Sequence, residues 1–186
     1  MKMHLGVVGI VSAGLMLGAA LKAHSAEPPP TGYAESPVNF VAVSERLHTA
    51  GQPSRAQLEA LKSKGYAFIV NLATPASSGA IPDEGMLIAK SGISYLNIPV
   101  DFKNPGYDDF ELFSNILRQS GSRRVLVHCQ VNKRASVFTF LYRVVHEGVS
   151  PDQAWGNVTS IWVPEPPWNE FVRMVLKRHS INFDPF

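Results

Sequence analysis

The stretch RRVLVHCQVNKRASVFTFLYRVVHEG, residues 123–148, decides how this chain is expected to fold. Residues 125–127 form an apolar run, Val-Leu-Val, which predicts a buried strand that ends at His128. Residues 133–147 are apolar nearly all round a helix and are followed by the stop residue Gly148, so this helix should lie in the middle of the domain. Cys129 therefore lies in a short loop between a strand and a helix, and Arg134 lies just after this loop.

Strand and helix patterns alternate along the rest of the chain. Apolar runs predict strands at residues 67–72 and 93–100. Periodic apolar positions and capping residues predict helices at residues 55–64, 82–92, 107–119 and 168–179, and Ser150-Pro151 begins a further helix. This order predicts a single α/β domain with a central, mostly parallel sheet flanked by helices. Sites in such sheets lie at the carboxyl ends of the strands. The loops after Leu72, Val100 and His128 should therefore meet.

The loop from Cys129 to Arg134 is the part of the chain best suited to chemistry. A helix N-terminus presents free backbone N–H groups and a positive field, which bind anions and favour the thiolate form of a cysteine. Arg134 falls in the first helical turn, where its planar fork can hold two oxygens of a tetrahedral oxyanion. Ser136 lies near enough to donate a hydrogen bond to the sulfur. An inert buried thiol and a solvated arginine are the alternatives.

This arrangement resembles the phosphate-binding loop of dual-specificity and tyrosine phosphatases: His-Cys, a short loop, Arg, and a Ser in the first helical turn. The likeness is to a bacterial subfamily and extends to residues 47–53, 71–72, 98–101 and 162–168. It implies a phosphomonoester hydrolase that acts through a phosphocysteine, with Cys129 as nucleophile and Arg134 as oxyanion holder. It also implies that the substrate phosphate is bound by a set of loop residues: His128, Gln130, Val131, Asn132, Lys133, Ala135 and Ser136. For His128, a purely structural role is the alternative.

The loop departs from the usual phosphatase pattern in its length. Those phosphatases have Cys-x5-Arg with Gly at the third position after Cys, whereas this chain has Cys-x4-Arg with Asn132 there. Asn is the commonest non-glycine residue at positive φ, so the turn can be kept. The shorter loop resembles that of rhodanese-like sulfurtransferases, including a small domain found fused to persulfide dioxygenases. A sulfurtransferase with a persulfide on Cys129 and a non-catalytic phosphate-binding module are therefore the alternatives.

Phosphoryl transfer from an ester needs an acid for the leaving oxygen and a base for the water that follows. Asp101, just beyond the strand at residues 93–100, is the expected proton donor and catalytic residue. Its separation from Cys129 is similar to that of the general acid in the phosphatases. Asp108 and Asp109 are rivals, although their place at the start of a helix already explains them.

Several other polar residues are weaker candidates for the pocket. Asp83 and Glu84 open a short helix and could face the site. Gln52, Asn71 and Trp162 could line it, with a turn, a strand end and a core aromatic as the ordinary explanations. The sequence contains no metal-ligand cluster, dinucleotide fingerprint or Walker motif, so we expect neither a metal nor a cofactor.

The first 26 residues have the pattern of a secretory signal peptide, because a weakly basic start is followed by an apolar run and small residues. Cleavage could follow Ser25 or Ala26, and a retained membrane anchor is the alternative. Residues 27–37 contain three consecutive prolines and are predicted to be an extended linker. Residues 38–186 are then the catalytic domain of an exported, periplasmic or secreted protein.

Composition limits the expected partners. The chain has 186 residues, of which 45% are hydrophobic, enough for one core. It has 17 basic and 15 acidic residues, and loss of Lys2 and Lys22 with the signal leaves 15 of each. A near-neutral chain without a basic run is not expected to bind nucleic acid or to insert stably into a membrane. We expect a monomer that acts on a phosphorylated small molecule or phosphoprotein.

Overall fold

The structure is a computed structural model that describes residues 36–186. The predicted signal peptide lies outside the described residues, as does the predicted linker apart from Ser36 and Pro37. The predictions for these two segments therefore stay predictions.

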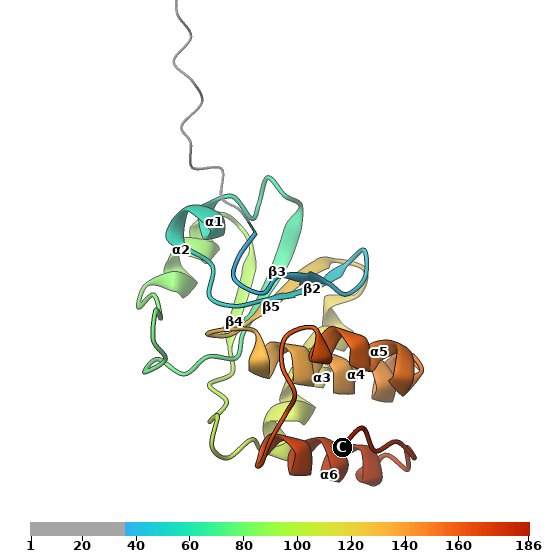
Figure 1. Ribbon diagram of the computed structural model, residues 1–186. Helices are drawn as coiled ribbons and strands as arrows, with labels where there is room; N and C mark the ends of the chain where they lie inside the picture. Colours follow the sequence, from blue (N-terminus) through green and yellow to red (C-terminus); the bar gives the residue numbers. More distant parts are fainter. Residues whose placement is uncertain (1–35) are drawn as a thin grey trace, which may run out of the picture. The chain divides into compact units, whose positions relative to one another are not determined.

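A five-stranded sheet forms the centre of the domain, with strand order β1-β2-β5-β3-β4 (Figure 1). The strands are β1 (Val41–Ala42), β2 (Leu47–Ala50), β3 (Tyr66–Asn71), β4 (Ser94–Asn97) and β5 (Arg124–His128). Only β1 runs antiparallel to its neighbour. In the middle of the sheet, His128 of β5 lies opposite both Ala50 of β2 and Asn71 of β3. The carboxyl ends of three parallel strands are therefore level with each other just before Cys129.

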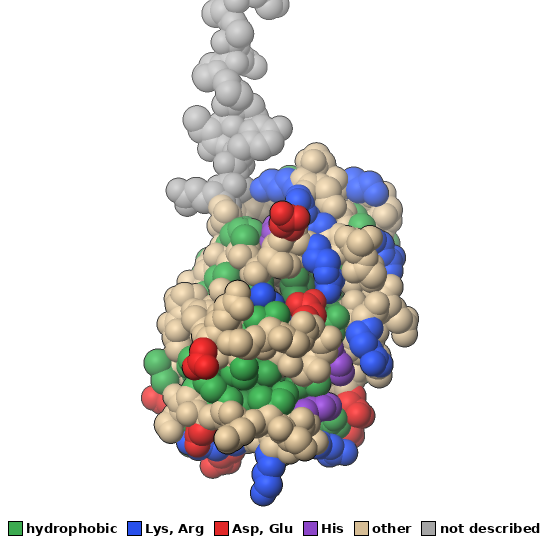
Figure 2. Space-filling model, turned by 90° about the vertical axis from the view of Figure 1, so that its right-hand side faces the viewer, with side chains coloured by type: hydrophobic (Ala, Val, Ile, Leu, Met, Phe, Trp, Pro, Cys, Tyr) green, Lys and Arg blue, Asp and Glu red, His purple; other side chains and the backbone are tan. Residues whose placement is uncertain are grey.

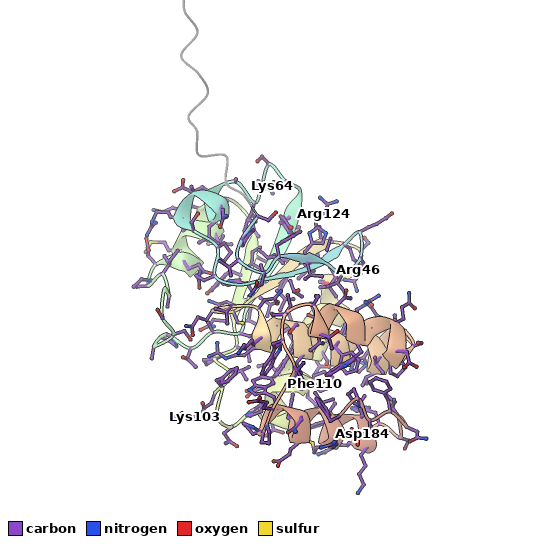
Figure 3. The ribbon with its side chains drawn as sticks, viewed as in Figure 1. Arg46, Lys64, Lys103, Phe110, Arg124 and Asp184 are labelled. Carbon is purple, nitrogen blue, oxygen red and sulfur yellow. The ribbon has the colours of Figure 1, made fainter. Side chains whose placement is uncertain are left out.

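Helices cover both faces of this sheet (Figure 1). One face carries α1 (Arg55–Glu59) and α2 (Glu84–Lys90); the other carries α3 (Tyr107–Ser120), α4 (Lys133–His146), α5 (Pro151–Thr159) and α6 (Trp168–Arg178). The alternation of side chains along β5 explains the two layers, since Val125 and Val127 belong to the core under α3–α6 and Leu126 to the core under α1 and α2. Figure 3 shows Phe110 of α3 within the larger layer.

The predicted place of the helix after the cysteine loop is confirmed. Helix α4 is buried along nearly its whole length and packs on β2, β5, α3, α5 and α6. The apolar stripe predicted for the last helix is also buried, at Trp168, Phe171, Val172, Val175 and Leu176. A single α/β domain with a mostly parallel sheet is therefore the observed fold class.

Three parts of the chain differ from the prediction. The strand predicted at residues 93–100 is shorter, and β4 ends at Asn97. Ser54 caps α1, but the helix ends at Glu59 instead of residue 64, and turns occupy residues 60–65. The tightening begins where the Leu61 N–H bonds the Leu58 carbonyl, three residues back instead of four. Strands β1 and β2 were not predicted, because they are short and β2 includes the polar pair His48 and Thr49.

The face of the molecule shown in Figure 2 has no single dominant charge. In Figure 2, basic side chains are interspersed with acidic, apolar and neutral ones on the face shown. Arg46, Lys64 and Arg124 lie at the amino ends of the parallel strands, away from the ends that lead to Cys129 (Figure 3). Within residues 36–186, no helix combines the length and the apolar character that a membrane span requires.

Candidate active site

Cys129 follows β5 directly and is only 1% exposed. Its backbone N–H donates to the Ala50 carbonyl at 3.2 Å, and the His128 carbonyl accepts from the Leu72 N–H at 2.8 Å. The chain at Cys129 is thus bonded to segments on both sides, which fixes where the sulfur lies.

Asn132 turns the shortened loop into helix α4. Its φ of 68° is left-handed, as predicted for an asparagine at this position, and its side chain is fully buried. The Asn132 Nδ2 donates to the Asn39 carbonyl at 2.5 Å and to the Thr49 Oγ1 at 3.0 Å. In return, the Asn39 Nδ2 donates to the Val131 carbonyl at 3.0 Å. The two bonds of the Asn132 side chain tie the loop to the β1–β2 region in a way that a glycine could not.

Gly51 allows the chain after β2 to pass close to the same loop. It forms an antiparallel bridge with Val131, and its N–H donates to the Val38 carbonyl at 2.7 Å. A Cβ on this residue would lie 3.0 Å from the Gln130 carbonyl oxygen and 3.1 Å from the Val131 Cα. The glycine in the Gly51-Gln52-Pro53 motif therefore has a packing reason.

Arg134 lies in the first turn of α4 and is only 6% exposed. Its Nε and Nη1 atoms are buried and have no hydrogen-bond partner among residues 36–186. The guanidinium carbon lies 5.5 Å from the centre of the Phe102 ring. Buried N–H groups without acceptors are costly, so the side chain is prepared for a ligand that supplies oxygens.

Cys129 and Arg134 line one cavity of about 300 Å³ together with Phe102, Gln130, Val131 and Lys133. The Lys133 Nζ lies 4.8 Å from the ring centre of Trp162, and that ring packs 5.9 Å from Phe102. Trp162, a weaker candidate from the sequence, therefore packs against Phe102, which lines the cavity. The sequence did not indicate Phe102 as a lining residue, although its apolar side chain directly follows Asp101 at a predicted strand end. None of the six lining residues is a carboxylate.

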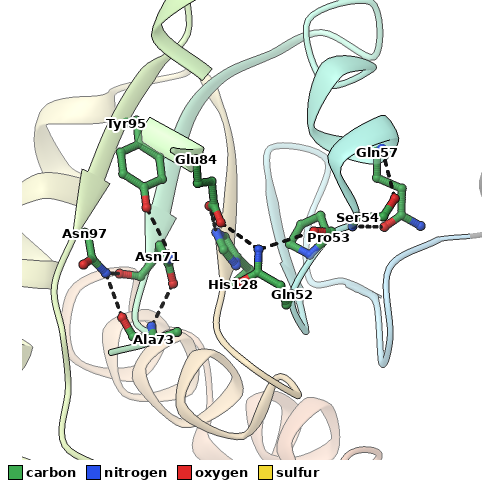
Figure 4. Close-up of polar contacts among 10 residues, drawn as sticks. All are labelled: Gln52, Pro53, Ser54, Gln57, Asn71, Ala73, Glu84, Tyr95, Asn97 and His128. Carbon is green, nitrogen blue, oxygen red and sulfur yellow. Dashed lines mark hydrogen bonds and ion pairs between the residues drawn. The ribbon is translucent and has the colours of Figure 1, made fainter. Parts of the chain in front are cut away.

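Two of the three loops expected to meet do so at this cavity, namely those after Val100 and His128. The loop after Leu72 instead lines a second cavity of about 610 Å³, together with Asn71, Tyr95, Asn97 and the start of α2. Side-chain bonds hold it there, since the Asn71 Oδ1 accepts from the Ala73 N–H at 2.8 Å (Figure 4). Asn71 also donates to the hydroxyl of Tyr95, and burial raises the pKa of Tyr95 to about 12.

A buried polar group lies next to the cysteine loop (Figure 4). The side chains of His128 and Glu84 are 0% and 2% exposed, and the Nε2 and Oε1 atoms lie 2.8 Å apart. This close contact lacks the alignment of a hydrogen bond. Gln52 donates to the Glu84 Oε2 at 2.7 Å. Glu84 is thus directed to the residue before Cys129, whereas Asp83 is exposed and pairs with Arg55, whose hydrogen bond lowers the pKa of Asp83.

Asp101 lies on an exposed turn beside the cavity and does not line it. Its Oδ1 accepts from the Lys103 N–H at 2.9 Å, so the carboxylate closes its own turn. Asp108 and Asp109 lie in the first turn of α3 and are also outside the lining. Burial raises the pKa of Asp109.

The remaining predicted phosphate-binding residues fall into two groups. Gln130, Val131 and Lys133 line the cavity, whereas Ala135 and Ser136 are buried in α4. The expected hydrogen bond from Ser136 to the sulfur does not form in the described structure. The Ser136 hydroxyl donates instead to the Lys133 carbonyl at 3.0 Å, which lies three residues back in the same helix.

The fold and the cysteine loop define a protein of the tyrosine- and dual-specificity-phosphatase-like class. A solved structure from Shewanella putrefaciens CN-32, a candidate phosphatase of the DUF442 family, is 31% identical, with a TM-score of 0.69. The match covers 76% of this chain and 93% of that one. The chain belongs to the DUF442 family.

More distant solved structures share the fold. Kinase associated phosphatase is 16% identical with a TM-score of 0.65, and the match covers 81% of this chain and 100% of that one. The catalytic core of the PP-IP phosphatase SIW14 from S. cerevisiae is 16% identical with a TM-score of 0.62, covering 77% of this chain and 92% of that one. No family model and no curated protein matches the chain.

Proposed function

We propose that this protein is a phosphomonoester hydrolase that works through a phosphocysteine on Cys129. The observation that carries the proposal is the buried guanidinium of Arg134, which has unpaired nitrogens and shares a cavity with Cys129 at the start of α4. The dianionic phosphate of an ester supplies the oxygens that this guanidinium lacks. Membership of the DUF442 family, with its candidate phosphatase of known structure, supports the same class of reaction.

In the first step the Cys129 thiolate attacks phosphorus, so that an S–P bond forms while the P–O bond to the leaving group breaks. Arg134 and the loop N–H groups hold the equatorial oxygens, where charge must be stabilised. Asp101 gives its proton to the leaving oxygen and then takes one from the attacking water. That water breaks the S–P bond and releases phosphate and the thiolate. The place of Asp101 next to the cavity-lining Phe102 supports this role.

Turnover of para-nitrophenyl phosphate and of an alkyl phosphate by single variants tests the mechanism. Changing Cys129→Ser should abolish both activities, and retained activity would rule the mechanism out. Changing Asp101→Asn should slow alkyl phosphate hydrolysis by about 10²–10⁴-fold, and the aryl ester less, because nitrophenolate needs little help to leave. Asp108→Asn is the matched control, since Asp108 is an exposed carboxylate outside the cavity lining and should act like the wild type.

A sulfurtransferase is the second candidate function, because the Cys-x4-Arg loop is short and no carboxylate of residues 36–186 lines the cavity. In that reaction the Cys129 thiolate attacks the outer sulfur of thiosulfate, releases sulfite and passes the sulfur from its persulfide to an acceptor such as cyanide. Mass spectrometry after thiosulfate treatment should then show the persulfide, and Asp101→Asn should have no effect. Absence of a persulfide in a protein that hydrolyses aryl phosphates would exclude this candidate.

Export is also a proposal, supported by the leader-like pattern of residues 1–26. N-terminal sequencing of the protein recovered from the periplasmic or secreted fraction should give a start directly after Ser25 or Ala26. A protein that stays in the cytoplasm with its full N-terminal segment would contradict export.

A further inference from the structure

Lys133 is a second cation of the catalytic cavity, and the proposed reaction does not use it. It is the first residue of α4 and lines the cavity beside Arg134 and Cys129. Within residues 36–186, no carboxylate lies within ion-pair distance of its ammonium group. Its charge is therefore not neutralised by the described part of the protein.

The ammonium group is held in place by an aromatic face. The Lys133 Nζ lies 4.8 Å from the ring centre of Trp162, which is a cation–π contact. Trp162 in turn packs against Phe102, and the Phe102 carbonyl accepts a hydrogen bond from the Trp168 Nε1 at 2.9 Å. A lysine restrained in this way loses less side-chain entropy on binding an anion than a free surface lysine would.

The cavity thus presents two positive groups of different kinds to its contents. Arg134 is 6% exposed and offers a planar fork at depth, whereas Lys133 is half-buried and offers a point charge with three rotatable donors. A single phosphate needs only the fork and the loop N–H groups. The ammonium therefore remains available to another anionic group on the same molecule.

We propose that the substrate carries a second anionic group on its leaving group, next to the scissile phosphate, and that Lys133 binds this group. The inference rests on the proposed phosphatase function and names the class of its substrate: a phosphomonoester with an additional carboxylate, phosphate or sulfate. The exposed edge of Phe102, 36% accessible, provides an apolar surface for the framework that joins the two anions.

The test compares two aryl esters that differ in one charge, meta-carboxyphenyl phosphate and its neutral analogue meta-carbamoylphenyl phosphate. The wild type should favour the carboxylate ester in kcat/KM by about 3–10-fold, as expected for one partly buried charge pair. Lys133→Met should bring the ratio of the two esters close to one, and Lys133→Arg should restore much of it. Added salt should weaken the wild-type preference.

Lys103→Met is the matched control. Lys103 is an exposed lysine on the turn that carries Phe102, but it does not line the cavity (Figure 3). This variant should keep the wild-type ratio. Equal ratios in the wild type and in Lys133→Met, or an equal loss in Lys103→Met, would overturn the assignment of Lys133 while leaving the phosphatase proposal intact.

Binding of the two corresponding non-hydrolysable benzylphosphonates, measured by titration calorimetry, separates this inference from the reaction itself. The carboxylate analogue should bind the wild type more tightly by about 3–10-fold, and Lys133→Met should abolish the difference. Such a difference would stand even if neither ester were hydrolysed, in which case only the proposed reaction would fail. Equal binding of both analogues to the wild type would overturn the second-anion site.

Discussion

Replacing Asn132 by alanine removes the side chain that holds the shortened loop. Two hydrogen bonds are lost, to the Asn39 carbonyl at 2.5 Å and to the Thr49 Oγ1 at 3.0 Å, and each contributes about 0.5–1.5 kcal/mol. Alanine at a φ of 68° adds about 1–2 kcal/mol of backbone strain. We therefore expect Asn132→Ala to lower the free energy of unfolding by about 2–5 kcal/mol. Glycine loses the same bonds but accepts the backbone angle, so Asn132→Gly should lose only about 1–3 kcal/mol.

Urea unfolding followed by tryptophan fluorescence measures both losses, with Thr49→Val as a variant that removes only one hydrogen-bond partner. The free energy of unfolding should decrease in the order wild type, Asn132→Gly, Asn132→Ala. Turnover of an aryl phosphate should fall in both Asn132 variants, because the loop that carries Cys129 loses its attachment to the β1–β2 region. Equal losses in the alanine and glycine variants would refute the role of the left-handed turn. Wild-type stability in both would refute the role of the bonds.

Three further predictions concern the surroundings of the loop. Gly51→Ala should lower the free energy of unfolding by about 1–3 kcal/mol and reduce turnover, because backbone atoms surround the new methyl group; unchanged urea unfolding would contradict this. Glu84→Leu should cost about 1–3 kcal/mol by leaving the buried Gln52 amide and His128 ring without their partner, with Glu84→Gln less damaging, and similar unfolding midpoints for all three proteins would count against it. Burial, and then the charge of Arg124, lowers the pKa of His48 from its ordinary 6.5. The free energy of unfolding should therefore be highest above pH 6.5, the pKa of the unfolded chain, and should fall as the pH drops through the lowered pKa of the folded protein. Unfolding measured from about pH 8 to pH 5 should show a fall that His48→Gln makes shallower, and an equally steep fall in the variant would oppose this assignment.

Local patterns predicted the parts of the fold that local physics determines. The strand that ends at His128 and the buried helix α4 follow from apolar runs and periodicity, and both are present. The positive φ of Asn132 was expected because the phosphatase loop that the chain resembles has glycine at this position and asparagine tolerates the same angle. The place of Cys129 and Arg134 at one cavity followed from the strand–loop–helix order.

Other features depend on contacts between distant segments and could not be predicted locally. Nothing near Asp83 and Glu84 distinguishes the exposed carboxylate from the buried one, because the difference comes from the packing of α2 beside His128. The short strand β2 shows no apolar alternation in its sequence. It is a strand because it pairs with β5, which is distant in the sequence. Ser136 was expected to bond the sulfur, but the helix offers it the nearer Lys133 carbonyl.

Detection of the phosphocysteine on Cys129 tests the proposed mechanism most directly. Acid quenching during turnover of an aryl phosphate, followed by mass spectrometry of the peptides, detects a phosphate on sulfur. The proposed mechanism should give a phosphorylated peptide that contains Cys129, more abundant in Asp101→Asn, where water attack on the intermediate is slowed. Continued turnover with Cys129 never phosphorylated, in the wild type and in Asp101→Asn alike, would contradict it.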